Sequence, residues 1–186
     1  MYSDGKRMRT SDDILDTLYT LDFLCAQRKI VAELIILGGS GILLNLEMMD
    51  EQFRSTRDID VNLIATNDTK SLLATLSEVN IDIIGGVMEV PPMEDFKDRK
   101  NSFHELDADF KSLRIYVPEI ELLACSKIFS TREKDLIDLK ETSLLKKYDR
   151  DKLLSLVEEY KGYILNINNP DLNYHQLHDI LKELGI

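Results

Sequence analysis

The sequence predicts a protein of the mixed α/β (α+β) class, with a small mixed sheet flanked by helices and a helical C-terminal part. Strand-like and helical segments alternate through the first two-thirds of the chain, whereas every strong pattern after Glu119 has helical spacing. We therefore expect a core over residues 1–118, with residues 1–10 loosely held, and a helical subdomain over 119–186.

The first part contains both kinds of periodicity. Apolar residues recur every three or four positions in three expected helices, at 12–29, 40–48 and 68–79. Continuously apolar or alternating runs predict strands at 33–37, 58–64, 81–84, 87–90 and 113–117. The alternation is strictest in Asp58–Ile64, which predicts a strand with one polar and one apolar face. Residues 93–105 are charged and show no period, so no element is expected there.

The second part contains helical patterns alone. Pro118 is expected to stop the last strand, since proline cannot donate to a sheet. Helices are then expected at 119–130, 134–147, 150–164 and 173–184, with Asn168-Asn169-Pro170 as a break.

Composition narrows the class of protein. A net charge of −11 argues against extended binding of DNA, although it permits a nucleotide that arrives with magnesium. No run approaches the roughly 20 apolar residues that cross a bilayer, and the N-terminus lacks a secretory signal. We expect a cytoplasmic protein without membrane partners, in which Cys25 and Cys125 are buried thiols.

A glycine-rich turn connects the first expected strand to the next helix. Gly38-Gly39-Ser40-Gly41 would place backbone N–H groups at a helix N-terminus, where glycines allow a phosphate to approach closely. Ser40 could cap the helix and also donate its hydroxyl to a phosphate oxygen. A purely structural turn with a capping serine would give the same pattern. Neither the P-loop nor the dinucleotide fingerprint fits, because the required lysine and third glycine are missing.

A pair of aspartates begins the alternating strand. Residues i and i+2 of a strand share a face, so Asp58 and Asp60 are expected to project side by side. Two such carboxylates repel each other unless a cation lies between them, and carboxylate oxygens suit Mg²⁺. The alternative is an exposed face with two solvated aspartates. Arg54, Thr56 and Arg57 precede the pair and could reach the same site.

Together these segments resemble a known superfamily. Leu37-Gly38-Gly39-Ser40 followed by Thr56-Arg57-Asp58-Ile59-Asp60-Val61 resembles the signature of the nucleotidyltransferase (DNA polymerase β-like) superfamily. Two later segments, Leu122–Lys127 and Arg132–Asp138, resemble a helical motif of AbiE-type toxin nucleotidyltransferases and their uncharacterised bacterial relatives. Met93–Arg99, before the last expected strand, also resembles those relatives.

The resemblance implies a nucleotidyltransferase fold that moves a nucleoside monophosphate from an NTP to a hydroxyl, with Mg²⁺. Carried over, the triphosphate would bind at Gly38, Gly39, Ser40 and Arg57. Asp58 and Asp60 would bind the metal. Lys127 and Asp135 match the lysine and aspartate of the later motif, although Asp135 and Asp138 could equally cap their helix or pair with neighbouring cations.

Active members of the superfamily also carry a third carboxylate on a later strand. Asp82 fits best, ahead of Asp109 and Glu89, because it lies in a β-like run. The acceptor would be a protein or an RNA, and the chain could be the toxin of a pair with an antitoxin partner. Without a third carboxylate, the same fold would be a nucleotide-binding sensor. A scaffold with coincidental motifs is the remaining alternative.

Overall fold

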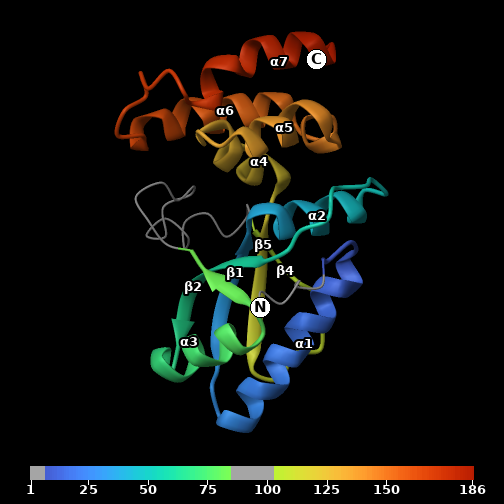
Figure 1. The fold of residues 1–186 in the computed structure, drawn as a ribbon, viewed down its shortest axis with the longest axis vertical. Helices are drawn as coiled ribbons and strands as arrows, with labels where there is room; N and C mark the ends of the chain where they lie inside the picture. Colours follow the sequence, from blue (N-terminus) through green and yellow to red (C-terminus); the bar gives the residue numbers. More distant parts are fainter. Residues whose placement is uncertain (1–6, 85–102) are drawn as a thin grey trace, which may run out of the picture.

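A computed structural model describes residues 7–84 and 103–186 of the chain. It confirms the mixed α/β class, with a five-stranded sheet in the order β3-β2-β1-β5-β4 (Figure 1). The strands are β1 (Ala32–Leu37), β2 (Ile59–Thr66), β3 (Ile81–Ile83), β4 (Phe103–Glu105) and β5 (Leu113–Pro118). The sheet is mixed, since β1 is antiparallel to β2 and parallel to β5, β2 is parallel to β3, and β4 is antiparallel to β5.

Helices accompany the sheet and then continue beyond it. Those beside the sheet are α1 (Ser11–Arg28), α2 (Gly38–Met48) and α3 (Thr69–Glu78). The C-terminal ones are α4 (Ile120–Ile128), α5 (Glu133–Glu141), α6 (Arg150–Tyr160) and α7 (Leu177–Leu184). In Figure 1, α4 to α7 form a layer beyond one end of the sheet, and α2 lies between this layer and the strands.

Two features of the chain differ from the expected elements. Strand β4 was not expected, because three residues in a charged stretch give no period, yet Phe103 is buried opposite Pro118. Pro118 is the last residue of β5, so it does not stop the strand one residue earlier. The expected strand at 87–90 lies outside the described residues.

The C-terminal helices are shorter than the periodicity predicts. Helix α5 ends at Glu141 because Thr142 takes an extended conformation, and its side chain accepts a hydrogen bond from the Leu144 N–H. Parts of the ranges that were predicted as α-helix form short 3₁₀ turns instead, at Ser143–Leu145, Lys161–Tyr163 and Asn173–Gln176. Such turns keep i to i+3 spacing, so sequence periodicity does not separate them from α-helix.

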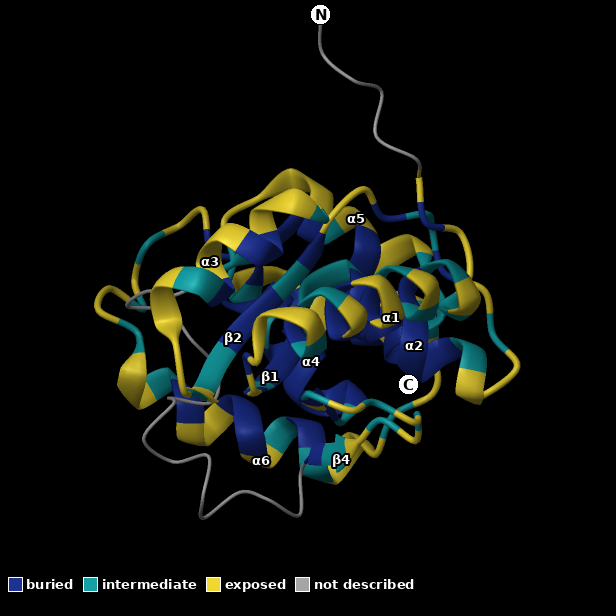
Figure 2. Cartoon of the chain, turned by 90° about the horizontal axis from the view of Figure 1, so that it is seen from below, coloured by how far each residue is buried: buried dark blue, intermediate teal, exposed yellow. Residues whose placement is uncertain are grey.

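One apolar core runs from the sheet into the C-terminal helices. The buried residues include Leu34 of β1, Leu43 of α2 and Leu123 of α4. Figure 2 shows buried segments in these elements in dark blue. The division at residue 118 stays a prediction. Met8 is buried and exchanges two backbone hydrogen bonds with Thr56, so this part of the N-terminal segment is held in place. Among the described residues, no helix combines the length and apolar character that a membrane crossing requires.

Candidate active site

The glycine-rich turn and the aspartate pair lie at the same end of the sheet. Leu37, the last residue of β1, is the register partner of Asp60 on β2. Gly38 follows directly in a left-handed conformation with φ of +60°. A Cβ added to Gly38 would lie 2.5 Å from Oδ2 of Asp60. The Asp60 carboxylate therefore rests against the backbone at the start of α2, and both conformation and space require glycine there.

Ser40 has a different role from helix capping. Leu37 occupies the N-cap position of α2 without a side-chain hydrogen bond, so Ser40 does not take the capping role that the sequence left open for it. The Ser40 side chain is buried, and its hydroxyl donates to the Asp58 carbonyl oxygen at 2.8 Å. The Thr56 hydroxyl donates to the same oxygen at 3.0 Å. These two bonds fix the backbone at Asp58 and connect it to the first turn of α2.

Asp82 lies beside the aspartate pair. It is the register partner of Asp60 in the parallel pairing of β3 with β2, so the two side chains share a face of the sheet. Partial burial raises the pKa of the Asp60 carboxyl, and the charges of Asp58 and Asp82 raise it further. Asp109 is at the opposite end of the sheet, before the β5 residue that pairs with the first residue of β1. Glu89 lies outside the described residues.

The three aspartates are suited to a hard cation. Burial is the main cause of the raised pKa of Asp60, and the negative charges of Asp58 and Asp82, which a bound cation would compensate, add to it. Within 7–84 and 103–186, no three ligating side chains are close enough to hold a metal by themselves. Magnesium does not need such a cage, because it usually takes one or two carboxylates and completes its shell with water and substrate phosphates. The donor set of Asp58 and Asp60 fits that requirement.

Cationic side chains approach the aspartates from the start of α5. The charges of Arg132 and Lys134 lower the pKa of Asp60, opposing the effect of the neighbouring carboxylates. Both side chains are exposed, as is Arg57 directly before Asp58. The structure thus brings positive charge from the start of α5 to the end of the sheet where Asp58, Asp60 and Asp82 lie.

Lys127 and Asp135 belong to a buried ion-pair network. The Lys127 ammonium lies 2.7 Å from carboxylate oxygens of both Asp135 and Asp138, and all three side chains are at most 4% exposed. Arg132 and the Ser130 hydroxyl also donate to Asp135, each at 2.7 Å. Burial opposes ionisation of Asp135, but Lys127 and these hydrogen bonds outweigh it and lower the pKa of the carboxyl.

The ion-pair network reaches the glycine turn through Arg54. From the sequence, this residue was expected only to lie close to the aspartate pair. The Arg54 guanidinium donates two hydrogen bonds to Asp138, one of them at 2.6 Å. Its Nη2 lies 3.8 Å from where a Cβ on Gly39 would stand. Three cations face two carboxylates, so the network carries excess positive charge. The sequence offered one signal for Asp138, which is its three-residue spacing from Asp135 on the same helix face.

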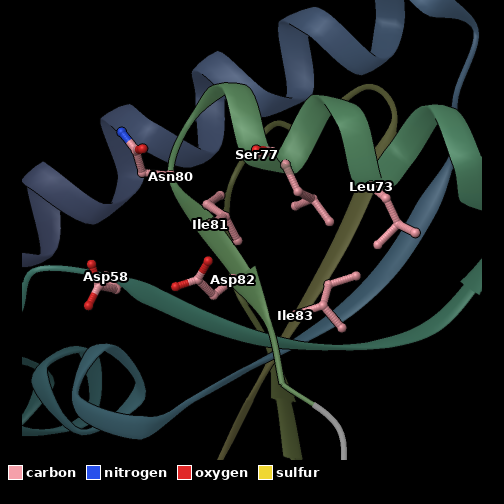
Figure 3. A pocket seen from close by; sticks show the side chains of 8 residues that line it. Asp58, Leu73, Ser77, Asn80, Ile81, Asp82 and Ile83 are labelled. Atoms are coloured by element: carbon pink, nitrogen blue, oxygen red, sulfur yellow. The ribbon is translucent and has the colours of Figure 1, made fainter.

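A pocket of about 380 Å³ opens beside the aspartates. It is lined by residues of α3, of the turn after α3 and of β3, and by Asp58 just before β2; the Asp82 side chain points toward Asp58 (Figure 3). The other lining residues are Leu73, Leu76, Ser77, Asn80, Ile81 and Ile83.

The cysteines take no part in this site. Both are buried, as expected, and burial raises the pKa of the Cys25 thiol to about 11 and that of Cys125 to about 12. Neither is a reactive thiolate at neutral pH.

Comparison with known families supports the fold and the superfamily expectation. The profile of a family described as "Nucleotidyltransferase of unknown function (DUF6036)" matches residues 15–183, which include every residue of the site above. Neither a curated protein nor a solved structure matches the chain. The match covers most of the chain, and the chain therefore belongs to this family of nucleotidyltransferases.

Proposed function

We propose that this protein is a Mg²⁺-dependent nucleotidyltransferase that moves NMP from an NTP to a hydroxyl of a protein or RNA acceptor. The observation that carries the proposal is the grouping of Asp58, Asp60 and Asp82 at the glycine turn, with a raised pKa at Asp60. Three carboxylates and a helix N-terminus with nearby cations supply the charges that nucleotidyl transfer requires.

The triphosphate binds at the start of α2. The first N–H groups of a helix have no intrahelical partner, and here they belong to Gly38, Gly39 and Ser40. Because the Ser40 hydroxyl already donates to Asp58, the backbone N–H groups supply the phosphate contacts in this proposal. Arg57, Arg132 and Lys134 add positive charge around the phosphates.

Asp58 and Asp60 hold the magnesium. When bound, the ion polarises the α-phosphate and lowers the pKa of the attacking hydroxyl. Asp82 accepts the proton of that hydroxyl. The acceptor oxygen forms a bond to the α-phosphorus, the bond from this phosphorus to the β-phosphate oxygen breaks, and pyrophosphate leaves.

Lys127 and Asp135 act as positioning residues. Lys127 is held by two buried carboxylates, so it shapes the site through its neighbours, without contacting a phosphate. Asp135 orients Arg132, and Asp138 orients Arg54 beside the glycine turn. Charged groups fixed in advance stabilise a phosphoryl transition state better than mobile ones.

Label transfer tests the proposal. The protein is incubated with each of four α-³²P-labelled NTPs, Mg²⁺ and cell extract, beside Asp58→Ala/Asp60→Ala and an exposed control, Asp16→Ala/Asp179→Ala. We expect labelled macromolecules with wild type and control, loss of label with the site variant, and loss with EDTA. Nucleotide binding without label transfer would instead indicate a sensor of the same fold.

A toxin role is the biological setting that the resemblance to AbiE-type proteins favours. We expect expression of the wild-type chain to arrest growth, and Asp58→Ala/Asp60→Ala to relieve the arrest. Equal growth with both chains would exclude a toxin that acts through this site.

A further inference from the structure

The pocket beside Asp58 and Asp82 is lined by negative charge, which is unusual in a protein that binds phosphate groups. Its ionisable lining residues are these two aspartates, and both side chains are exposed. Among the described residues that line it, none is lysine or arginine. The cations that act on Asp60, Arg132 and Lys134, come from α5 and are not part of the lining. Phosphate charge is therefore stabilised near α5, whereas within the pocket it is opposed by Asp82, which holds no metal in the proposed site.

The remaining lining is largely apolar. Leu73, Leu76, Ile81 and Ile83 form the walls, and Ser77 and Asn80 add two polar groups (Figure 3). Leu73 is 48% exposed although it faces the pocket. A volume of about 380 Å³ is large enough for one or two side chains but is at the small end for ligand sites.

We propose that this pocket receives the acceptor, and that the acceptor is a serine, threonine or tyrosine side chain of a polypeptide. The inference rests on the proposed function and narrows its acceptor class. The terminal hydroxyl of an RNA is accompanied by the phosphate of its own nucleotide, which would meet the charge of Asp82, the lining carboxylate that holds no metal in the proposed site. A protein hydroxyl brings no such charge, and apolar residues next to it can pack on Leu73 and Ile83.

The position of β3 favours an extended polypeptide over a small hydroxyl compound. Within the described ranges β3 is the edge strand of the sheet, and it carries Asp82. Extended peptides commonly bind by adding to such an edge, with side chains in pockets along it. A segment aligned there presents its hydroxyl to Asp82, which takes the proton while the oxygen bonds to the α-phosphorus and pyrophosphate leaves.

Fractionated acceptors test the inference. Wild-type protein, Mg²⁺ and α-³²P-labelled NTPs are incubated separately with RNase-treated total protein, with deproteinised total RNA and with the low-mass fraction of an extract. We expect label in protein, resistant to RNase and mapped by mass spectrometry to serine, threonine or tyrosine. Label in RNA or small molecules alone would overturn this inference and leave nucleotidyl transfer standing. No label in any fraction would overturn the proposed function itself.

A surface variant tests the pocket. Leu73→Ser removes an exposed part of the apolar wall, and Leu165→Ser, at a residue 82% exposed in the C-terminal part, is the matched control. We expect Leu73→Ser to lower labelling of protein roughly tenfold or more, the effect of losing apolar contact in a binding pocket. Nucleotide affinity, measured by calorimetry, should not change. Equal labelling by both variants would overturn the assignment of the pocket.

Discussion

Oδ2 of Asp60 occupies the space beside Gly38, 2.5 Å from where a Cβ would stand on that residue. The glycine turn and the D-x-D strand therefore fit together directly. We expect Gly38→Ala to destabilise the fold by at least about 1–2 kcal/mol, since alanine disfavours the left-handed conformation and its Cβ displaces the carboxylate. Urea unfolding measures the change, and label transfer should fall with it.

Gly162→Ala is the control for this substitution. A Cβ at Gly162 meets no atom within 4 Å, and the residue lies in a 3₁₀ turn with an ordinary backbone conformation. Stability and transfer should stay near wild type. Equal loss in both variants would contradict the proposed fit between Gly38 and Asp60.

Asp60 should cost the metal-free protein stability. Its pKa is raised above the unfolded value by burial and by Asp58 and Asp82, so its charge is unfavourable in the folded state at neutral pH. We expect Asp60→Asn to raise the free energy of unfolding by about 1 kcal/mol at pH 7 without Mg²⁺. Replacing a residue that is kept for function at a cost in stability commonly stabilises a protein by this order.

The stability effect of Asp60 should depend on pH. The wild-type penalty disappears as pH falls through the raised folded pKa, so the advantage of Asp60→Asn should shrink near pH 4. Asp68→Ala is the opposite control, because Asp68 caps α3, its pKa is lowered by Ser71, and its loss should destabilise. An Asp60→Asn protein that melts below wild type at pH 7 would contradict the repulsion among the three aspartates.

Lys127 should be more important for folding than any exposed cation. Lys127→Met leaves Asp135 and Asp138 buried without their shared partner, and breaking a buried pair costs about 3–5 kcal/mol. Arg114→Ala removes an exposed pair with Glu105 and should change stability far less. Urea denaturation of both variants measures the difference. Similar midpoints would mean that the buried network adds little to stability.

Asp135 should make stability sensitive to acid. Its folded pKa lies below the unfolded value of about 3.9, so its contribution is complete above that pH and is lost as pH falls through the folded pKa. Asp135→Asn should be less stable than wild type at pH 7 and lose less stability on acidification. Circular dichroism melts from pH 7 to pH 3 measure both slopes, and parallel slopes would contradict the lowered pKa.

Substitution of Asp82 should separate nucleotide binding from nucleotidyl transfer. We expect Asp82→Asn to bind NTP with near wild-type affinity and to lose roughly 10²–10⁴-fold in transfer rate, the usual contribution of a general base. Asp109→Asn, at the opposite end of the sheet, should retain activity. Full activity of Asp82→Asn would remove Asp82 from the proposed proton transfer.

Much of the fold could be predicted because its elements carry strong local signals. Helix α1 has apolar residues at helical spacing, and β2 alternates, so both were expected almost where they lie. Strand β4 was missed because three residues among charges have no usable period, and its stability comes from pairing with β5. Ser40 does not cap α2, a role the sequence permitted, because its hydroxyl donates to the nearby Asp58 carbonyl oxygen.

By itself, the sequence determined the local chemistry of this protein: two glycines at the start of a helix, and two aspartates, Asp58 directly before strand β2 and Asp60 within it. Tertiary structure alone decided what surrounds them. Strand order places Asp82 beside Asp60, and packing of α5 buries Asp135 and Asp138 against Lys127 and Arg54. The reason is physical. A charged residue looks identical in a sequence whether water solvates it or a buried ion-pair partner neutralises it, and long-range packing determines which of the two occurs.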